Sequence, residues 1–158
     1  MIAEDIHIVT LGPLRVASFL GFGSEPELQA LQKLMNWATS KGFMERIEEH
    51  RIFGFNNPNP SPGSPNYGYE FWITVGPEVE SKAEVEVKEI PAERYAVARC
   101  EVRGNPGEAI PAAWKRLVAW REESSYQQAS HQWLEEHLNI ANISQGVWDM
   151  DLYLPITE

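Results

Sequence analysis

The sequence predicts an α+β fold made of two copies of one unit, each with strands, a helix and a closing strand. Apolar residues alternate and lead to an Arg-x-Ala motif at residues 6–19 and again at 85–98. A helical pattern follows each segment, and an aromatic-rich strand pattern closes each half of the chain. Internal repetition of this kind determines the architecture. We therefore expect repeats over about 1–76 and 84–157 within one domain of 158 residues.

The two helices can be placed from their start signals and apolar faces. Ser24-Glu25-Pro26-Glu27 has the form of a capping box with proline in the first turn, and Gly42 marks the end, which predicts a helix over 25–41. The second helix is predicted over 108–122. Apolar residues recur at helical spacing in both: Leu28, Leu31, Leu34, Met35 and Ala38 in the first, and Ile110, Trp114, Leu117 and Val118 in the second.

The closing strands are predicted at YGYEFWITV (67–75) and VWDMDLYLPI (147–156). Successive side chains of a strand point to opposite faces, so the face that carries Phe71 is predicted to lie in the core. The segment 56–66, rich in Pro, Asn, Ser and Gly, is predicted to be a loop. It is equally consistent with a rim over a site and with a surface insertion.

Each closing strand has an acid followed two positions later by an aromatic residue. The pairs are Glu70 with Trp72, and Asp151 with Tyr153. A carboxylate among apolar side chains needs water, a hydrogen-bond partner or a positive charge. Aromatic planes beside a carboxylate suit a flat ligand with a positive charge. A wet sheet edge with a partly exposed ring is the alternative, and the repetition of the pair favours the ligand site.

The composition excludes several classes of partner. The chain has 13 basic and 23 acidic residues, a formal net charge of −10, which disfavours nucleic acid and anionic membranes. It has no apolar stretch near the roughly 20 residues of a membrane span and no signal-peptide pattern, so we expect a cytoplasmic protein. The one cysteine, Cys100, lies in a strand pattern and is predicted to be a buried thiol.

No motif for a cofactor or a metal stands out. Glycine-rich phosphate loops are absent, and Cys100 stands beside no histidine in the sequence. The two Glu-Glu-His runs, in 47–50 and 134–137, could be metal ligands or solvated charged turns. We favour the turns because no second spaced ligand set accompanies them. We expect neither cofactor nor metal.

The ordered set of patterns resembles the GyrI-like small-molecule-binding domain, a family of effector-binding modules of AraC-type and MerR-type regulators that also has free-standing members. The resemblance rests on YEFWITV, AIPAAWKRLVAW and DLYLPI, and it extends over nearly the whole chain. It implies β-α-β-β units related by a pseudo-twofold axis. It also implies a central cleft between their sheets that takes planar, often cationic, hydrophobic compounds.

The resemblance also implies which residues form the site. The family's cleft acid falls on Asp151, where the longer Glu is expected. We therefore favour its counterpart Glu70 as the acid that reaches the ligand. We expect Glu70 to face the cleft and to be paired with a ligand rather than with a lysine. The candidate ligand-binding residues are Tyr69, Glu70, Trp72, Trp114, Asp151 and Tyr153.

Two functions follow from the resemblance. In the first, the protein is a free-standing binder of planar hydrophobic, cationic compounds, because the repeat begins near Ile6 and leaves no room for a preceding DNA-binding domain. In the second, it hydrolyses cyclopropane-bearing genotoxins, with Glu70 as general base. Some free-standing relatives inhibit a protein partner such as DNA gyrase, and the sequence identifies no such partner.

Overall fold

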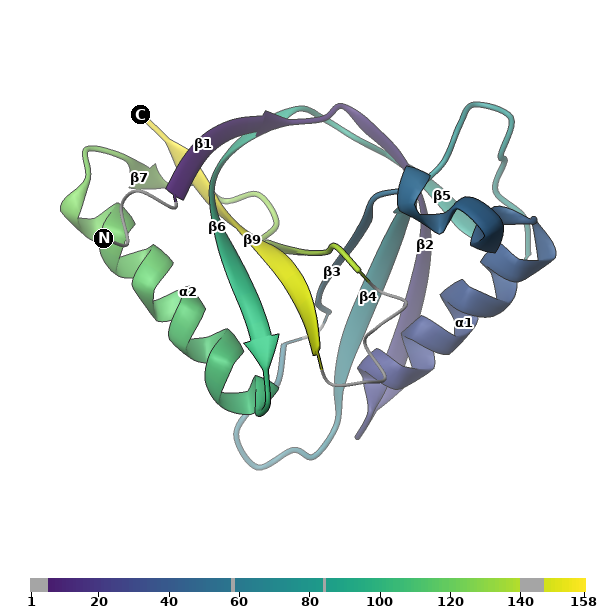
Figure 1. The fold of residues 1–158 in the computed structure, drawn as a ribbon, viewed down its shortest axis with the longest axis horizontal. Coiled ribbons are helices and arrows are strands. Elements are labelled where there is room, and N and C mark those ends of the chain that lie inside the picture. The colour runs from purple at the N-terminus through teal and green to yellow at the C-terminus, as the bar shows by residue number, and fades with distance from the viewer. Residues whose placement is uncertain (1–5, 58, 84, 140–146) are drawn as a thin grey trace. The chain divides into compact units, whose positions relative to one another are not determined.

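The computed structural model of the chain contains two compact units, Leu14–Ile90 and Met1–Pro13 with Pro91–Glu158. Each unit has antiparallel strands and one long α-helix that lies along one face of its sheet (Figure 1). This confirms the predicted α+β class. The structure describes residues 6–57, 59–83, 85–139 and 147–158.

The unit Leu14–Ile90 contains four strands whose order in the sheet is β3-β4-β2-β5. In chain order its elements are β2 (Leu14–Gly23), α1 (Pro26–Ser40), the 3-10 helix η2 (Phe43–Glu49), β3 (Ile52–Asn56), β4 (Tyr67–Thr74) and β5 (Glu86–Ile90). The predicted loop between β3 and β4 is confirmed in its described residues. The strand β3 is the first strand after the helix in the implied β-α-β-β unit, although its residues were not assigned from the sequence.

The other unit has the strand order β1-β6-β9-β8, and the short strand β7 pairs with the end of β9. Its elements are β1 (Ile6–Leu11), β6 (Glu93–Arg103), α2 (Pro106–Glu123), β7 (Gln127–Gln128), β8 (Leu134–His137) and β9 (Val147–Thr157). Within the described part of the chain, no helix combines the length and the apolar character that a membrane crossing requires.

The two units share one order of elements. Apart from η2 in the first unit and β7 in the second, the series β2-α1-β3-β4 matches β6-α2-β8-β9, and β5 beside β2 corresponds to β1 beside β6. The unit boundaries differ from the predicted repeats because β1 and β5 pair with strands of the other half of the sequence. The shared order supports an internal duplication, which stays a prediction.

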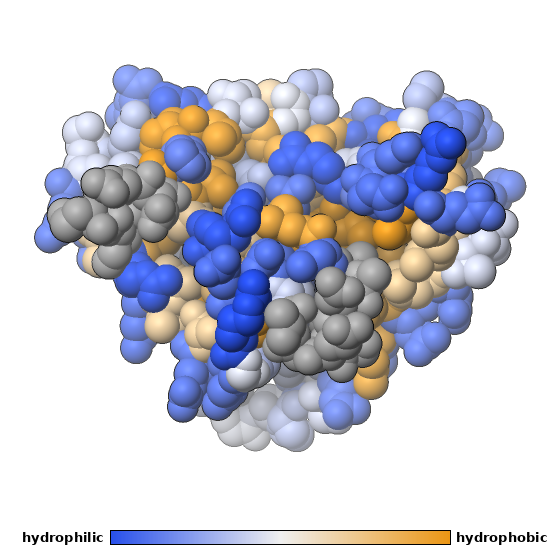
Figure 2. All heavy atoms as spheres, viewed as in Figure 1, coloured by the Kyte–Doolittle hydropathy of each residue, from blue (hydrophilic) through white to orange (hydrophobic). Residues whose placement is uncertain are grey.

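Apolar packing between helix and sheet forms the core of each unit. In the first unit Leu34 and Trp37 of α1 are buried, and Trp37 contacts Phe19 of β2 at 5.5 Å between ring centroids. In the second, Ala113 and Leu117 of α2 join the buried cluster of β6 and β9, which includes Cys100, Leu152 and Leu154. The predicted burial of the Cys100 thiol is thereby confirmed. Figure 2 shows orange, apolar atoms over β1, whose isoleucines pack against the edge of this cluster.

Three local predictions need correction. The cap residue of α1 is Glu25, without a side-chain cap bond, whereas the Asn105 side chain caps α2 by accepting from the Gly107 amide at 2.9 Å. Leu28, predicted to lie on the apolar face, is 60% exposed. The run Leu134–His137, predicted to be a solvated turn, forms the strand β8, with Glu136 and His137 buried. Pairing with β9 overrides the local charge pattern there.

We predict that Gly21→Ala destabilises the protein by roughly 1–3 kcal/mol, the usual cost of overpacking. A Cβ at Gly21 would overlap the carbonyl oxygen of Pro26 and lie 2.9 Å from the Ala30 amide, so β2 and α1 would have to separate. Urea denaturation measures the loss. Gly107→Ala, where an added Cβ meets only the Asn105 side chain at 3.2 Å, is the matched control and should change stability little. Equal midpoints for both variants would contradict the prediction.

Candidate functional site

We call the face of the first sheet that α1 does not cover the open face of this unit. It carries a polar group among aromatic residues. The register places Ser18 of β2 beside Trp72 of β4, and Phe55 of β3 beside Glu70. Because side chains alternate along a strand, Glu70 and Trp72 share this face, as predicted. Lys88 of β5 pairs with Val16 of β2 and joins the face from the other side.

Glu70 is 2% exposed, and its carboxylate has four hydrogen-bond donors. One oxygen, Oε2, accepts from the Ser18 hydroxyl at 2.6 Å, the Trp72 indole N–H at 2.7 Å and the Lys88 ammonium at 2.7 Å. The other, Oε1, accepts from the Asn57 amide at 2.9 Å. The expectation that Glu70 has no lysine partner is therefore wrong. Lys88 provides the positive charge that a carboxylate this deeply buried needs.

These contacts determine the charge of Glu70. Burial alone raises its pKa, but the hydrogen bonds from Lys88, Ser18, Asn57 and Trp72 together bring the pKa below its ordinary value of 4.5. The carboxylate is thus ionised at neutral pH. A carboxylate with a lowered pKa and four donors is a weak base, which counts against Glu70 as a general base.

Aromatic side chains stand on both faces of β4. On the open face Trp72 is buried and meets Phe55 edge-on, with 4.8 Å between ring centroids. Tyr69, a predicted ligand-binding residue, lies on the opposite face, where it contacts Phe71 at 5.0 Å and fills the space beside Gly54. The structure therefore brings Glu70 and Trp72 together and separates Tyr69 from them.

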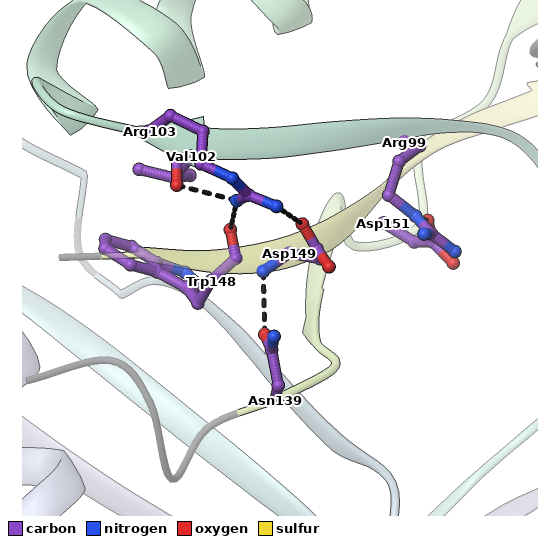
Figure 3. A network of polar contacts seen from close by, with 7 residues as sticks. All are labelled: Arg99, Val102, Arg103, Asn139, Trp148, Asp149 and Asp151. Atoms are coloured by element: carbon purple, nitrogen blue, oxygen red, sulfur yellow. Dashed lines mark hydrogen bonds and ion pairs between the residues drawn. The ribbon is translucent and has the colours of Figure 1, made fainter. Parts of the chain in front are cut away.

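The open face of the second unit, opposite α2, carries two acid–arginine pairs. Asp151 of β9 accepts from Arg99 of β6 at 2.7 Å, and Asp149 accepts from Arg103 at 3.1 Å. Figure 3 shows both pairs, and it shows the Asp149 backbone amide donating to the side-chain oxygen of Asn139. Asp151, like Glu70, therefore already has a basic partner.

A further acid on this face was not predicted. Glu136 of β8 lies opposite Asp151 in the register and is only 7% exposed. The hydroxyl of Tyr153 donates to its Oε1 at 2.6 Å, and the Tyr153 ring meets Tyr95 edge-on at 5.4 Å. The run Leu134–His137 has no alternation of apolar and polar residues and is too short for a clear period, so no local signal revealed this strand. The predicted aromatic Tyr153 thus contacts a buried carboxylate.

The remaining candidate, Trp114, lies on the other side of the second sheet. It is a half-buried residue of α2 whose indole N–H donates to Glu135 at 3.3 Å, and its ring meets Trp133 at 5.2 Å. Glu135 is one residue from Glu136 and so points to the α2 side of β8. The structure therefore does not bring Trp114 together with Asp151 or Tyr153.

Other polar groups in the described residues form no competing metal site. No cluster of three or more His, Cys, Asp or Glu side chains could hold an ion among them. Beside Glu136, burial lowers the pKa of His137 to about 4, and the negative charge of Glu136 only partly opposes this, so His137 is neutral at pH 7.

Two surface pockets of about 240 and 280 Å³ are lined by residues other than the predicted site residues. The first is lined by Trp37 and Phe43 among others, and the second by Arg94 and His131 among others.

Several solved structures share this fold. The C-terminal domain of EcmrR superposes with a TM-score of 0.66 at 13% identity, covering 97% of both chains. The chain covers only 57% of the EcmrR chain in its DNA complex. SAV2435 bound to tetraphenylphosphonium matches with a TM-score of 0.54 at 12% identity, covering 96% of this chain and 93% of that one. A hydrolase from Listeria innocua matches with a TM-score of 0.64 at 12% identity, covering 97% of this chain and 92% of that one.

The fold and the match to a family model together identify a GyrI-like effector-binding domain. The family model of the integron-associated effector-binding protein, Cass2, matches residues 7–156, nearly the entire chain. The chain belongs to this family. A search of curated proteins finds no match.

We predict that Glu70→Gln lowers the free energy of unfolding at neutral pH by roughly 2–4 kcal/mol, because the amide leaves Lys88 without its counter-ion. The folded-state pKa of Glu70 is lowered, so its stabilisation is present above the unfolded pKa and is lost as the pH falls through the folded pKa. The difference between the two proteins should therefore shrink in acid. Chemical denaturation at several pH values tests this, with the exposed Glu122→Gln as control. A difference that stays constant below pH 4.5 would contradict it.

Proposed function

We propose that the protein binds planar, hydrophobic small molecules that carry a positive charge, and that it does so at the open faces of its two units. The observation that carries this proposal is a buried carboxylate bonded to an aromatic side chain in each unit, Glu70 with Trp72 and Glu136 with Tyr153. The tetraphenylphosphonium bound by SAV2435, a hydrophobic cation with four phenyl rings, supports the cationic and aromatic character of this ligand class.

The chemistry of these groups fits such a ligand. An aromatic ring holds a flat apolar body by stacking and attracts a cation through its negative face. A carboxylate in a site of low dielectric attracts a cation strongly, so the site should prefer charged ligands to neutral ones. The predicted residues Glu70, Trp72, Asp151 and Tyr153 lie on the open faces and remain the proposed ligand contacts, and Glu136 joins them.

Hydrolysis of strained, cyclopropane-bearing electrophiles is the second candidate function. It follows from the family resemblance, and a hydrolase from Listeria innocua shares the fold at 12% identity. The four donors to Glu70 make this residue a poor general base, so binding is the stronger proposal.

We predict that the protein binds tetraphenylphosphonium more tightly than its neutral relative triphenylphosphine oxide, because only the cation is attracted by the carboxylates. Glu136→Gln should weaken binding of the cation by roughly 1–3 kcal/mol, the scale of one charge-assisted contact, and leave binding of the neutral compound unchanged. Glu70→Gln should act in the same direction.

Isothermal titration of both compounds measures this. The control is Glu122→Gln, which removes one negative charge from an exposed position of α2. Equal losses for the two compounds, or equal losses in the control and in Glu136→Gln, would contradict the proposed charge selectivity.

A separate prediction concerns turnover. If the protein hydrolyses cyclopropane-bearing electrophiles with Glu70 as base, mass spectrometry should detect a product that has gained one water. Glu70→Gln should then abolish the product and leave binding measurable, because the amide keeps the shape and loses the base. Binding without product, or equal turnover in the variant, would exclude Glu70 as the base.

A further inference from the structure

We infer that the Lys88 ammonium occupies the place of the ligand's positive charge on Glu70, so that a cationic ligand reaches this carboxylate by displacing Lys88. The inference rests on the proposed function and adds a regulatory element to it. In the free protein the Glu70 site is closed to cations by a cation of the chain itself.

The geometry at Glu70 separates Lys88 from the other three donors. Ser18, Asn57 and Trp72 donate through neutral groups on short or rigid side chains. Lys88 alone brings a charge, 2.7 Å from Oε2, at the end of a flexible four-carbon chain. Its side chain is 31% exposed, whereas that of Glu70 is 3% exposed. The ammonium can therefore move toward water, and the carboxylate cannot.

The charge balance explains why displacement is needed. The pair Glu70–Lys88 is neutral, and the described residues place no second cation on this carboxylate. A ligand cation placed beside the intact pair would meet one attraction and one repulsion of similar size, which leaves little net energy. It gains the full attraction of Glu70 only after the Lys88 ammonium has left.

The energetic cost of displacement limits affinity in the natural protein. Lys88 gives up a charge-assisted hydrogen bond, and its hydration outside the site recovers part of that energy. Tetraphenylphosphonium has no N–H donor and cannot replace the lost hydrogen bond. Removal of the ammonium should therefore help this cation in particular.

The first experiment compares tetraphenylphosphonium and triphenylphosphine oxide by isothermal titration. Lys88→Met keeps the apolar stem and removes the competing charge, so it should bind the phosphonium roughly tenfold more tightly and the neutral oxide unchanged. Lys33→Met is the matched control. It removes one positive charge from the same unit, where the Lys33 ammonium donates to the Leu20 carbonyl at 2.6 Å at an exposed position, and it should leave both affinities unchanged. An equal gain in both variants would mean general charge repulsion and overturn the inference.

A second experiment uses the natural protein, in case Lys88→Met does not fold. Amine acetylation followed by mass spectrometry reports how exposed each lysine is. Lys88 should react slowly in the free protein and several-fold faster when tetraphenylphosphonium is bound. The other lysines serve as internal references: Lys33, Lys41, Lys82 and Lys115. Protection of Lys88 by the ligand, or an unchanged rate, would overturn the inference.

The outcomes separate the two proposals. If neither the natural protein nor Lys88→Met binds the phosphonium or the oxide, the proposed function fails and the inference fails with it. If the natural protein binds the phosphonium and Lys88→Met binds it equally well, the function stands and the inference alone is wrong. Binding that occurs only in Lys88→Met supports the inference directly.

Discussion

The burial of the Glu70 carboxylate is the constraint around which the unit Leu14–Ile90 is organised. An ionised carboxylate with 2% exposure is stable only if hydrogen bonds and a counter-ion replace its water. The donors come from four segments: Ser18 from β2, Asn57 from the residue after β3, Trp72 from β4 and Lys88 from β5. One side chain therefore fixes the positions of all four strands of this sheet.

The need to neutralise Glu70 explains why β5 lies beside β2 in this unit. In the predicted repeats, β5 belongs to the second copy, yet it pairs with β2 and provides the charged donor to Glu70 among the described residues. Without β5 the unit would keep its helix and its aromatic residues but would bury an uncompensated charge. Because β5 leads directly into β6 of the other unit, the chain cannot be cut between 76 and 84 without separating Glu70 from Lys88.

The sequence predicts the elements well and the polar partners poorly, for a physical reason. Helices and closing strands have a local periodicity, so α1, α2 and the shared face of Glu70 and Trp72 could be predicted from it. Lys88 could not be found because its contact depends on strand pairing across the repeat boundary. Glu136 was missed because Leu134–His137 is a short, charged segment that is buried only through its pairing with β9.

The two units place different chemistry beside their buried acids, and this difference bears on ligand class more than the acids themselves do. Glu70 has a lysine, whose charge cancels its own, and Glu136 has the Tyr153 hydroxyl among its contacts. Asp151 has the planar guanidinium of Arg99, which is half exposed and on the surface contributes little energy. A count of carboxylates therefore overstates the attraction for cations, because a carboxylate attracts a ligand only to the extent that its protein partners leave its charge uncompensated or can be displaced.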